Sequence, residues 1–567
     1  MTVSQDAPPR VDLIPSEQPA SAGTDTDPPE VEALPAPEGE TELIVTEYEI
    51  GQHNVAPRYV LEFDFHQKVF TISALGVIGF TILTLAFQNT AEPVFLALRD
   101  WLTGSLGWFF LLAGNIFVLL CLGLILSPLG RIRLGGPEAT PDYGYLGWFA
   151  MLFAAGMGIG LMFYGVSEPL SHYNAALGGV SLDDSGARTD WAPLGGAEGD
   201  PEAALRLGMA ATIFHWGLHP WAIYAIVALS LALFAYNKGL PLTLRSAFYP
   251  IFGEKIWGWR GDVVDILAIF ATIFGLATSL GIGAQQAAAG LDFLFGFGQS
   301  QSRLILLIIV ITVVAIVSVI RGLEGGVKRL SEVNMALAAA LLIFVIALGP
   351  TANIFTGFFA NLGAYGQHLP ALANPFGRED ANFTAGWTAF YWAWWISWSP
   401  FVGMFIARVS RGRTVREFLI AVLIVPSLLS VLWMTALGGT AIDQAANGVS
   451  GVQEAALELQ LFEMLGQMPM AALTSLVGIL LVVIFFVTSS DSGSLVIDTI
   501  AAGGKTNAPV VQRVFWCSFE GLLAVALLLG GGLGALQAMA VSTGLPFTLV
   551  LLAACYAIVR GLMNEPR

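Results

Sequence analysis

The sequence predicts an all-α integral membrane protein with twelve transmembrane helices. Of its 567 residues, 55% are hydrophobic and only 12% are charged, and the mean hydropathy is +0.71. Soluble globular domains contain about 25% charged residues. A helix needs about 20 apolar residues to cross a bilayer, and twelve such stretches occur: 67–88, 108–129, 144–169, 207–236, 262–290, 303–321, 331–350, 384–408, 416–438, 472–497, 514–533 and 536–561.

The distribution of Lys and Arg predicts the orientation of these spans. With a cytoplasmic N-terminus, 17 of the 25 Lys and Arg residues fall in inner loops and 5 in outer loops; Arg10, Arg58 and Lys68 lie in or beside the N-terminal segment. Cytoplasmic loops of membrane proteins carry an excess of positive charge. Both termini are therefore expected in the cytoplasm, which agrees with an even number of spans.

Residues 1–64 have a different composition from the rest of the chain. They hold 14 acidic residues against Arg10 and Arg58, which gives a net charge of −12 out of −17 for the whole chain. A segment rich in Pro, Glu, Asp and Ser is typical of disorder. It lacks the basic region, apolar stretch and small-residue site of a cleaved signal peptide. We therefore expect an acidic, disordered cytoplasmic tail.

Glycines crowd the third predicted span, AAGMGIGLMFYGVSEP at 154–169. Gly156, Gly158, Gly160 and Gly165 would each weaken a helix, so their clustering predicts a break or a close approach. Unwound backbone at membrane depth faces protein or a cavity, where its free N–H and C=O groups bind a carboxylate or a cation. Close helix packing through the Gly156 and Gly160 pair is the alternative.

Aromatic residues gather in the fourth span, FHWGLHPWAIY at 214–224. Pro220 frees a backbone carbonyl and kinks the helix, and the rings near this kink are Trp216, Trp221 and Tyr224. His215 and His219 are four residues apart, a spacing that permits a shared metal. No Glu accompanies this pair as a base and no third ligand is apparent.

Four tryptophans lie in the eighth span, FYWAWWISWSP at 390–400. The face of an indole ring attracts a desolvated cation, above all a quaternary ammonium group. Trp is costly to bury without partners, so the cluster favours a ligand-contacting lining over simple packing between helices, which remains the alternative. The residues are Trp392, Trp394, Trp395 and Trp398.

Hydroxyl groups cluster in the tenth span, FFVTSSDSGS at 485–494. Neutral oxygens in a dry site suit a small alkali cation, whereas Ser and Thr also join helices within membranes. Asp491 is unusual because a carboxylate within a span is generally functional, although it also suits a helix end at the inner interface. The hydroxyl-bearing residues are Thr488, Ser489, Ser490 and Ser492. Cys121, Cys517 and Cys555 fall in apolar spans and predict no disulfide or metal framework.

These motifs together resemble the betaine/carnitine/choline transporter family over nearly all of residues 60–560. The resemblance rests on GMGIG with FYG and SEP, on HWGLHPWAIY, on FYWAWWISWSPFVGMFIARVSRGRT and on FFVTSSDSGS. It implies a homotrimer in the bacterial cell (inner) membrane, with two leading helices and then two inverted five-helix repeats like those of sodium-coupled amino-acid transporters. The corresponding divisions are residues 65–135, 140–350 and 384–562, with an extracytoplasmic connection at 351–383 and a short tail at 563–567.

The resemblance also implies roles for individual residues. The aromatic box that binds substrate would be Trp216, Trp221, Tyr224 and Trp395, facing the glycine-motif residues Gly156, Met157, Gly158 and Gly160. The inner exit path would be Phe390, Trp394, Trp398 and Phe405. One sodium ion would be held by Ala154, Met157, Phe485, Thr488 and Ser489. A second sodium site at Tyr224, Thr272 and Phe401 is in doubt, because Leu276 replaces an expected oxygen ligand and only Thr278 offers a substitute.

Gly160 bears on the substrate. Similar proton-coupled choline carriers have Asp at this position, whereas a neutral site suits a zwitterion such as glycine betaine and sodium as the driving ion. We therefore expect a secondary active transporter that couples uptake of glycine betaine to sodium by alternating access. Ectoine, carnitine, proline betaine and choline are the alternatives. No cofactor besides the coupling ions and no nucleic-acid partner is expected.

Two other functional classes fit the sequence poorly. An intramembrane enzyme needs a nucleophile with a base or a metal cluster, and the spacing of His215, Glu168, Asp491 and Glu520 matches neither. A sensor that does not transport would usually add a folded cytoplasmic output domain.

Overall fold

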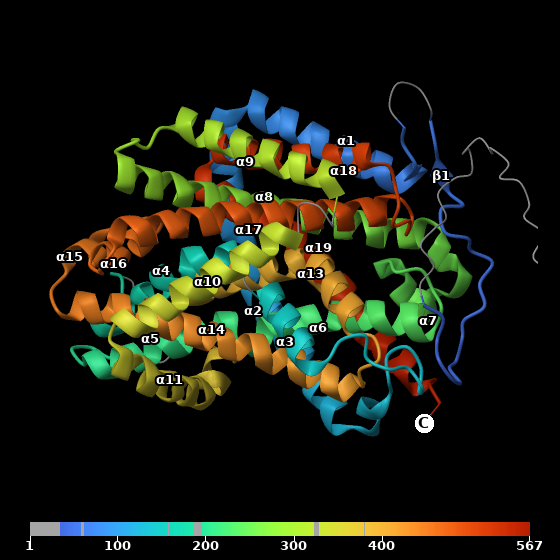
Figure 1. Cartoon of the computed structure of the whole chain (residues 1–567), viewed down its shortest axis with the longest axis horizontal. Coiled ribbons are helices and arrows are strands. Elements are labelled where there is room, and N and C mark those ends of the chain that lie inside the picture. The colour runs from blue at the N-terminus through green and yellow to red at the C-terminus, as the bar shows by residue number, and fades with distance from the viewer. Residues whose placement is uncertain are drawn as a thin grey trace, which may run out of the picture.

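Long helices that run side by side along one axis dominate the computed structural model (Figure 1). It describes residues 35–57, 62–156, 158–184, 188, 195–322, 328–378 and 380–566. Within these ranges, ten helices are long and apolar enough to cross a membrane, and a bent helix pair makes eleven. The all-α membrane protein predicted from composition is thus confirmed. The eighth predicted span, 384–408, corresponds to α13 (Ala389–Val409), which is not among these helices because its Trp, Tyr and Ser residues lower its hydropathy.

The first half of the chain ends with α10. Its helices are α1 (Gln67–Ala86), α2 (Gln88–Leu126), η1 (Pro128–Arg131), α3 (Tyr145–Gly156), α4 (Ile159–Gly178), α5 (Pro201–Trp216), α6 (Leu218–Ala232), η2 (Leu233–Asn237), η3 (Leu244–Phe248), α7 (Tyr249–Phe252), η4 (Gly253–Trp257), α8 (Trp259–Phe295), α9 (Gln301–Gly322) and α10 (Lys328–Leu348).

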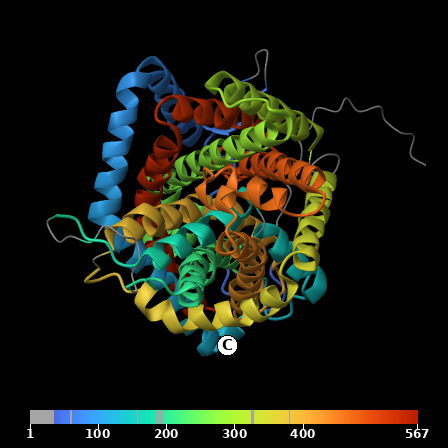
Figure 2. The same ribbon diagram turned by 90° about the vertical axis from the view of Figure 1, so that its left-hand side faces the viewer.

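The second half begins with a helix that lies across the others. α11 (Thr351–Leu372) runs crosswise over the end of the bundle that faces the viewer in Figure 2. The remaining helices are α12 (Ala381–Phe383), η6 (Thr384–Thr388), α13, α14 (Val415–Ala446), α15 (Ser450–Glu454), α16 (Gln460–Gly466), α17 (Ala471–Ala501), α18 (Val510–Leu529) and α19 (Gly532–Met563).

Two spans of the first half are broken. α3 and α4 meet at an angle of 66° within the glycine motif, so the break predicted from the glycine cluster is present. α5 and α6 are separated at Gly217, three residues before Pro220. A proline cannot donate a backbone hydrogen bond to the preceding turn, which explains why the helix ends here. Both breaks expose backbone polar groups within the span.

The interior is built from the helices that carry the predicted motifs. α13 packs against α6, and α17 packs against α8. The α6 and α13 backbones approach closely because position 403 is Gly: a Cβ there would lie 2.6 Å from Cγ1 of Val227. Small residues permit this type of contact between membrane helices.

The predicted disorder of residues 1–64 is wrong for the part that the structure describes. Residues 35–57 lie along the end of the bundle that also carries the C-terminus (Figure 1). Glu38 forms an ion pair with Arg411 at 2.5 Å, and the Tyr48 ring stacks on Trp257 with a centroid distance of 4.2 Å. The composition suggested a solvated tail, but these specific partners bind the segment to the bundle.

A short β-ribbon completes this docked segment. β1 (Asn54–Val55) pairs antiparallel with β2 (Phe65–His66), directly before α1. Beside it, Asp64 forms an ion pair of 2.5 Å with Lys505 in the turn between α17 and α18. Residues 1–34 and 58–61, the remainder of the predicted tail, lie outside the described residues.

Candidate substrate and ion sites

The four aromatic residues predicted to contact substrate line one cavity near the middle of the bundle. Trp216 is the last residue of α5, Trp221 and Tyr224 lie on α6, and Trp395 lies on α13. All four are at least 92% buried. The free volume between them is about 40 Å³, so the rings stand close together.

The rings meet edge to face. The Trp216 and Trp395 centroids are 4.9 Å apart at 78°, those of Tyr224 and Trp395 are 6.1 Å apart at 82°, and those of Trp221 and Tyr224 are 5.3 Å apart at 76°. Aromatic pairs favour this arrangement because the electropositive ring edge faces an electronegative ring face. All four rings line the cavity, and the face of an aromatic ring attracts a cation.

The broken glycine span forms the opposite wall. Gly156, Gly158 and Gly160 line the same cavity, and a Cβ at Gly160 would lie 2.7 Å from Cη2 of Trp216. The absence of a side chain thus allows the indole to pack against the α4 backbone. Met157, which the sequence placed in both the substrate and the sodium site, lies outside the described residues.

The breaks also fix the orientation of the cavity rings. Gly217 interrupts the helix, and the carbonyl of His215 accepts a hydrogen bond from Nε1 of Trp395 at 3.0 Å. Nε1 of Trp216 donates to Oε2 of Glu168 on α4 at 2.6 Å. The N–H groups of Trp216 and Trp395 therefore have partners that hold these two rings in place.

Glu168 is the centre of a buried network that sequence reasoning missed. The carboxylate is fully buried and joins α4, α5 and α13. Its partners are Trp216 Nε1, Tyr391 Oη and His215 Nδ1, each at 2.6 Å, and His172 Nε2 at 3.2 Å. A carboxylate in a membrane span is the signal that marked this residue, but its partners lie up to 223 residues away in the chain.

The two histidines of the fourth span have different partners. His215 and His219 do not converge on a common point: Nε2 of His219 pairs with Oδ1 of Asn115 at 2.9 Å. His215 instead groups with Glu168 and His172, whose ligand atoms lie within 4.8 Å of one another. Hydrogen bonds between these same atoms account for the cluster without a metal ion.

A second cavity of about 190 Å³ collects the residues predicted for the first sodium ion. Ala154 from α3 and Phe485, Thr488 and Ser489 from α17 all line it. The Thr488 hydroxyl donates to the carbonyl oxygens of Ile484 and Phe485, at 3.0 and 3.1 Å. Its proton is thus directed along the helix, and its lone pairs remain available to a cation.

Two other polar residues of this motif, Ser490 and Asp491, contact neighbouring helices instead. Ser490 donates to Glu520 on α18, and Asp491 accepts a hydrogen bond of 2.7 Å from Ser318 on α9. Because α17 continues to Ala501, Asp491 does not cap a helix end. These two residues join neighbouring helices, whereas Ser492 lines the second cavity.

The residues predicted for the second sodium ion do not line a common cavity. Tyr224 lines the aromatic cavity, Phe401 lines the second cavity, and the Thr272 hydroxyl donates to the Ala268 carbonyl at 2.8 Å. Leu276 packs against α17, where its Cδ1 lies 2.3 Å from the position that a Cβ of Gly493 would take.

The hydroxyl of Thr278, the possible substitute ligand, has two backbone partners. It contacts the carbonyl oxygens of Phe274 at 2.8 Å and of Leu536 at 3.1 Å, toward α19 and away from this region.

Trp398 borders both cavities. It lines both of them, together with Ala155, and its Nε1 donates to Oγ of Ser279 at 3.1 Å. Of the other residues predicted for the exit path, Trp394 lines the aromatic cavity and Phe405 lines the second one. Phe390 lines neither and stacks on Trp394 at 5.4 Å.

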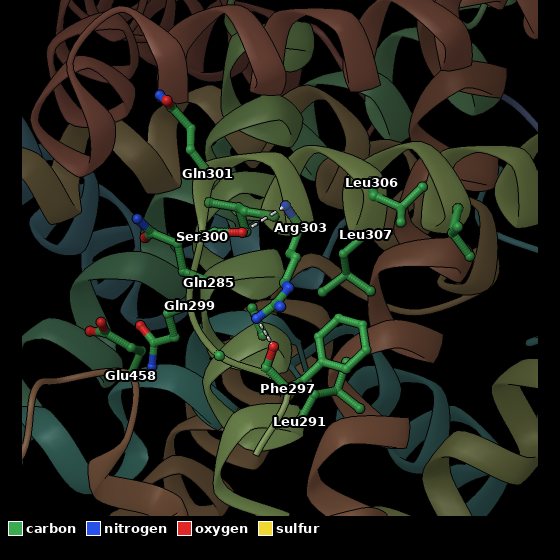
Figure 3. A pocket seen from close by; sticks show the side chains of 14 residues that line it. Gln285, Leu291, Phe297, Gln299, Ser300, Gln301, Arg303, Leu306, Leu307 and Glu458 are labelled. Atoms are coloured by element: carbon green, nitrogen blue, oxygen red, sulfur yellow. Dashed lines mark hydrogen bonds between the residues drawn. The ribbon is translucent and has the colours of Figure 1, made fainter. Parts of the chain in front are cut away.

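A larger cavity, of about 340 Å³, lies at the turn between α8 and α9 and contains none of the predicted site residues (Figure 3). The Arg303 guanidinium donates to the backbone carbonyl of Phe297 and lies 5.3 Å from the Phe297 ring centroid. Its charge is therefore engaged within its own turn.

Comparison with known proteins identifies the family. The sequence model of the betaine/carnitine/choline family of transporters matches residues 68–567. The chain belongs to this family. A glycine betaine/proline/choline transporter of Vibrio parahaemolyticus is 64% identical over 533 residues, which cover 94% of this chain and 96% of that protein. Glycine betaine transporter 1 of the same organism is 52% identical, over 92% of this chain and 97% of that protein.

More distant members carry the same type of name. The glycine betaine transporter OpuD of Bacillus subtilis is 41% identical over 502 residues, which cover 88% of this chain and 94% of that protein. The resemblance inferred from the motifs is thus confirmed, and the chain is a multi-pass membrane transporter rather than an enzyme.

Proposed function

We propose that this transporter couples the uptake of glycine betaine to sodium by alternating access. The observation that carries the proposal is the aromatic cavity: the rings of α5, α6 and α13 face the broken glycine span, and none of the described residues that line the space between them is charged. A neutral cavity suits a molecule whose own charges cancel, because burial of a net charge in a low-dielectric site is costly.

The two walls of the cavity complement the two ends of glycine betaine. The quaternary ammonium has no N–H group and binds best against ring faces, which Trp216, Trp221, Tyr224 and Trp395 supply. The carboxylate suits the start of α4, where Gly158 caps the helix. The first N–H groups of a helix lack intrahelical acceptors, and the positive end of the helix dipole favours an anion there.

The second cavity supports sodium as the coupling ion. Thr488 and Ser489 on α17 and Ala154 on α3 are among the residues that supply oxygen atoms to its wall. The break that ends α3 begins two residues after Ala154. A cation held between α17 and this break would stabilise the same backbone that receives the substrate carboxylate, which links occupancy of the two sites.

Alternating access requires a barrier that closes one side of the substrate site while the other side is open. We propose that Trp398 forms part of this barrier, since it lines both cavities.

We propose twelve spans, with α13 as the eighth, arranged as two inverted five-helix repeats after α1 and α2. We also propose a homotrimer in the bacterial inner membrane, with the end that carries β1 and the C-terminus facing the cytoplasm.

The proposal also covers other solutes that compete with glycine betaine. The Vibrio parahaemolyticus relative is named for glycine betaine, proline and choline, so choline and proline are tested as competitors beside ectoine, carnitine and proline betaine. Choline lacks the carboxylate that would contact α4. We therefore expect it to compete more weakly than glycine betaine.

Uptake of labelled glycine betaine into proteoliposomes tests the function. We expect accumulation with an inward sodium gradient, and none when the same gradient is made with potassium or protons. Unlabelled glycine betaine should compete in full. Accumulation driven equally well by a proton gradient would refute sodium coupling, and a lack of any betaine accumulation would refute the substrate.

A further inference from the structure

A cavity of about 320 Å³ lies between α5, α11 and α14, at the end of the bundle where α5 begins. It shares no lining residue with the aromatic cavity. Its wall combines apolar residues with charged ones of both signs: Glu202 and Arg206 from α5 and Asp443 from α14. Neither the substrate path nor the ion sites described above use these residues.

Arg206 is held in place by buried polar groups. Its Nη1 donates to Oδ1 of Asn361 on α11 at 2.5 Å, and Nδ2 of Asn361 donates to Oγ1 of Thr435 on α14 at 3.0 Å. Asn361 and Thr435 are 2% and 3% exposed. A chain of hydrogen bonds across three helices therefore fixes the direction of the guanidinium.

The charge of Arg206 has no carboxylate partner in the described part of the chain. Arg206 forms no ion pair there within 4 Å, and Asn361 is the acceptor of its one side-chain hydrogen bond. Guanidinium groups bind carboxylate or phosphate oxygens in a bidentate manner, and the remaining N–H donors of Arg206 are available for this. Arg303, in contrast, is engaged by the Phe297 carbonyl and ring (Figure 3).

The acidic residues of the cavity supply negative charge for the cationic group of a ligand. Glu202 precedes Arg206 by one helical turn, and Asp443 lies on the facing helix. Neither is within ion-pair distance of Arg206 in the described structure. Charges of both signs that are kept apart in one cavity match a ligand that carries both signs.

We propose that this cavity binds a small zwitterion, with its carboxylate or phosphate group on Arg206 and its cationic nitrogen toward Asp443. Free glycine betaine and the ethanolamine headgroup of a phospholipid share this chemistry. The inference rests on the geometry of this cavity and is independent of the function proposed for the aromatic cavity.

Two variants test the site in different ways. Arg206→Gln removes the charge. Gly439→Leu adds bulk to the cavity wall, and a Cβ at this position would meet nothing nearer than Met209 Cε at 3.9 Å. Gly363→Leu on α11 is the matched control: it has no neighbouring atom within 4 Å and does not line the cavity.

The experiment measures both ligand sources on the purified full-length chain. Equilibrium dialysis of labelled glycine betaine uses a Trp395→Leu background, so that the aromatic cavity contributes little, and mass spectrometry counts the phosphatidylethanolamine that remains bound. We expect one of the two ligands to be lost at least tenfold in both Arg206→Gln and Gly439→Leu and to be retained in Gly363→Leu.

Each outcome has a definite meaning. Loss of betaine assigns the cavity to the free solute, and loss of phosphatidylethanolamine assigns it to the lipid headgroup. If both variants keep control levels of both ligands, the proposal is wrong. Should Arg206→Gln fail to fold, Gly439→Leu still decides, because it keeps the hydrogen-bond chain of Arg206 intact. Failure of the transport assay would leave this result unaffected.

Discussion

Trp395 offers the sharpest test of the aromatic cavity. Its ring meets Trp216 at 4.9 Å and Tyr224 at 6.1 Å, and the side chain is 8% exposed. A desolvated cation–π contact contributes about 2 kcal/mol, and each 1.4 kcal/mol corresponds to tenfold in affinity. Trp395→Leu removes the ring and should weaken betaine binding by roughly 30-fold or more.

A graded series separates ring chemistry from volume. Trp395→Phe keeps a ring with a weaker quadrupole, so we expect a loss of about 1 kcal/mol, or roughly fivefold. Isothermal titration of purified protein with glycine betaine measures both affinities. Trp516→Leu on α18 is the control for the loss of a buried indole, because Trp516 is fully buried and lines neither site. Equal affinities for wild type and Trp395→Leu would refute the cation–π argument.

Three further predictions concern the ions, the glycine motif and the docked N-terminal segment. Thr488→Ala combined with Ser489→Ala should raise the sodium concentration for half-maximal uptake at least tenfold, and Thr272→Ala less than twofold; an equal effect of Thr272→Ala would support a second ion. Gly160→Asp should weaken betaine uptake, because its Cβ would crowd an indole ring, and should lower the betaine-to-choline ratio; an unchanged ratio in competition assays would contradict this. Tyr48→Ala should lower the free energy of unfolding by about 3 kcal/mol, as expected for loss of a buried aromatic ring; an unchanged thermal midpoint would mean that the segment is not docked.

The family and the main site could be predicted from the sequence because the relevant signals are local. A span with Gly156, Gly158 and Gly160 is weak as a helix wherever it is placed, so a break was one of the two outcomes that the sequence predicted there. Trp216 and Trp395 are identified by residue type. Only the family resemblance predicted that they meet in one cavity, because they lie 179 positions apart in the sequence.

Composition gave the wrong prediction for residues 35–57, because specific contacts with the helices decide whether this segment is ordered. An acidic, proline-rich segment is generally disordered because it buries little apolar surface. Residues 35–57 nevertheless dock, because Glu38 meets Arg411 and Tyr48 stacks on Trp257. No local property of the segment reveals these partners.

By itself, the sequence determined that this protein is helical, lies in a membrane and belongs to a family of betaine-type transporters, because composition, glycine content and residue type act locally. Only the tertiary structure decided which groups meet. It placed the Glu168 carboxylate on the indole of Trp216, directed the Thr278 hydroxyl toward the Leu536 carbonyl on α19, and left Arg206 facing a cavity without a carboxylate partner in the described chain. The physical reason is that hydrogen-bond partners, packing and side-chain direction depend on contacts between helices far apart in the chain, and a linear pattern does not contain those contacts.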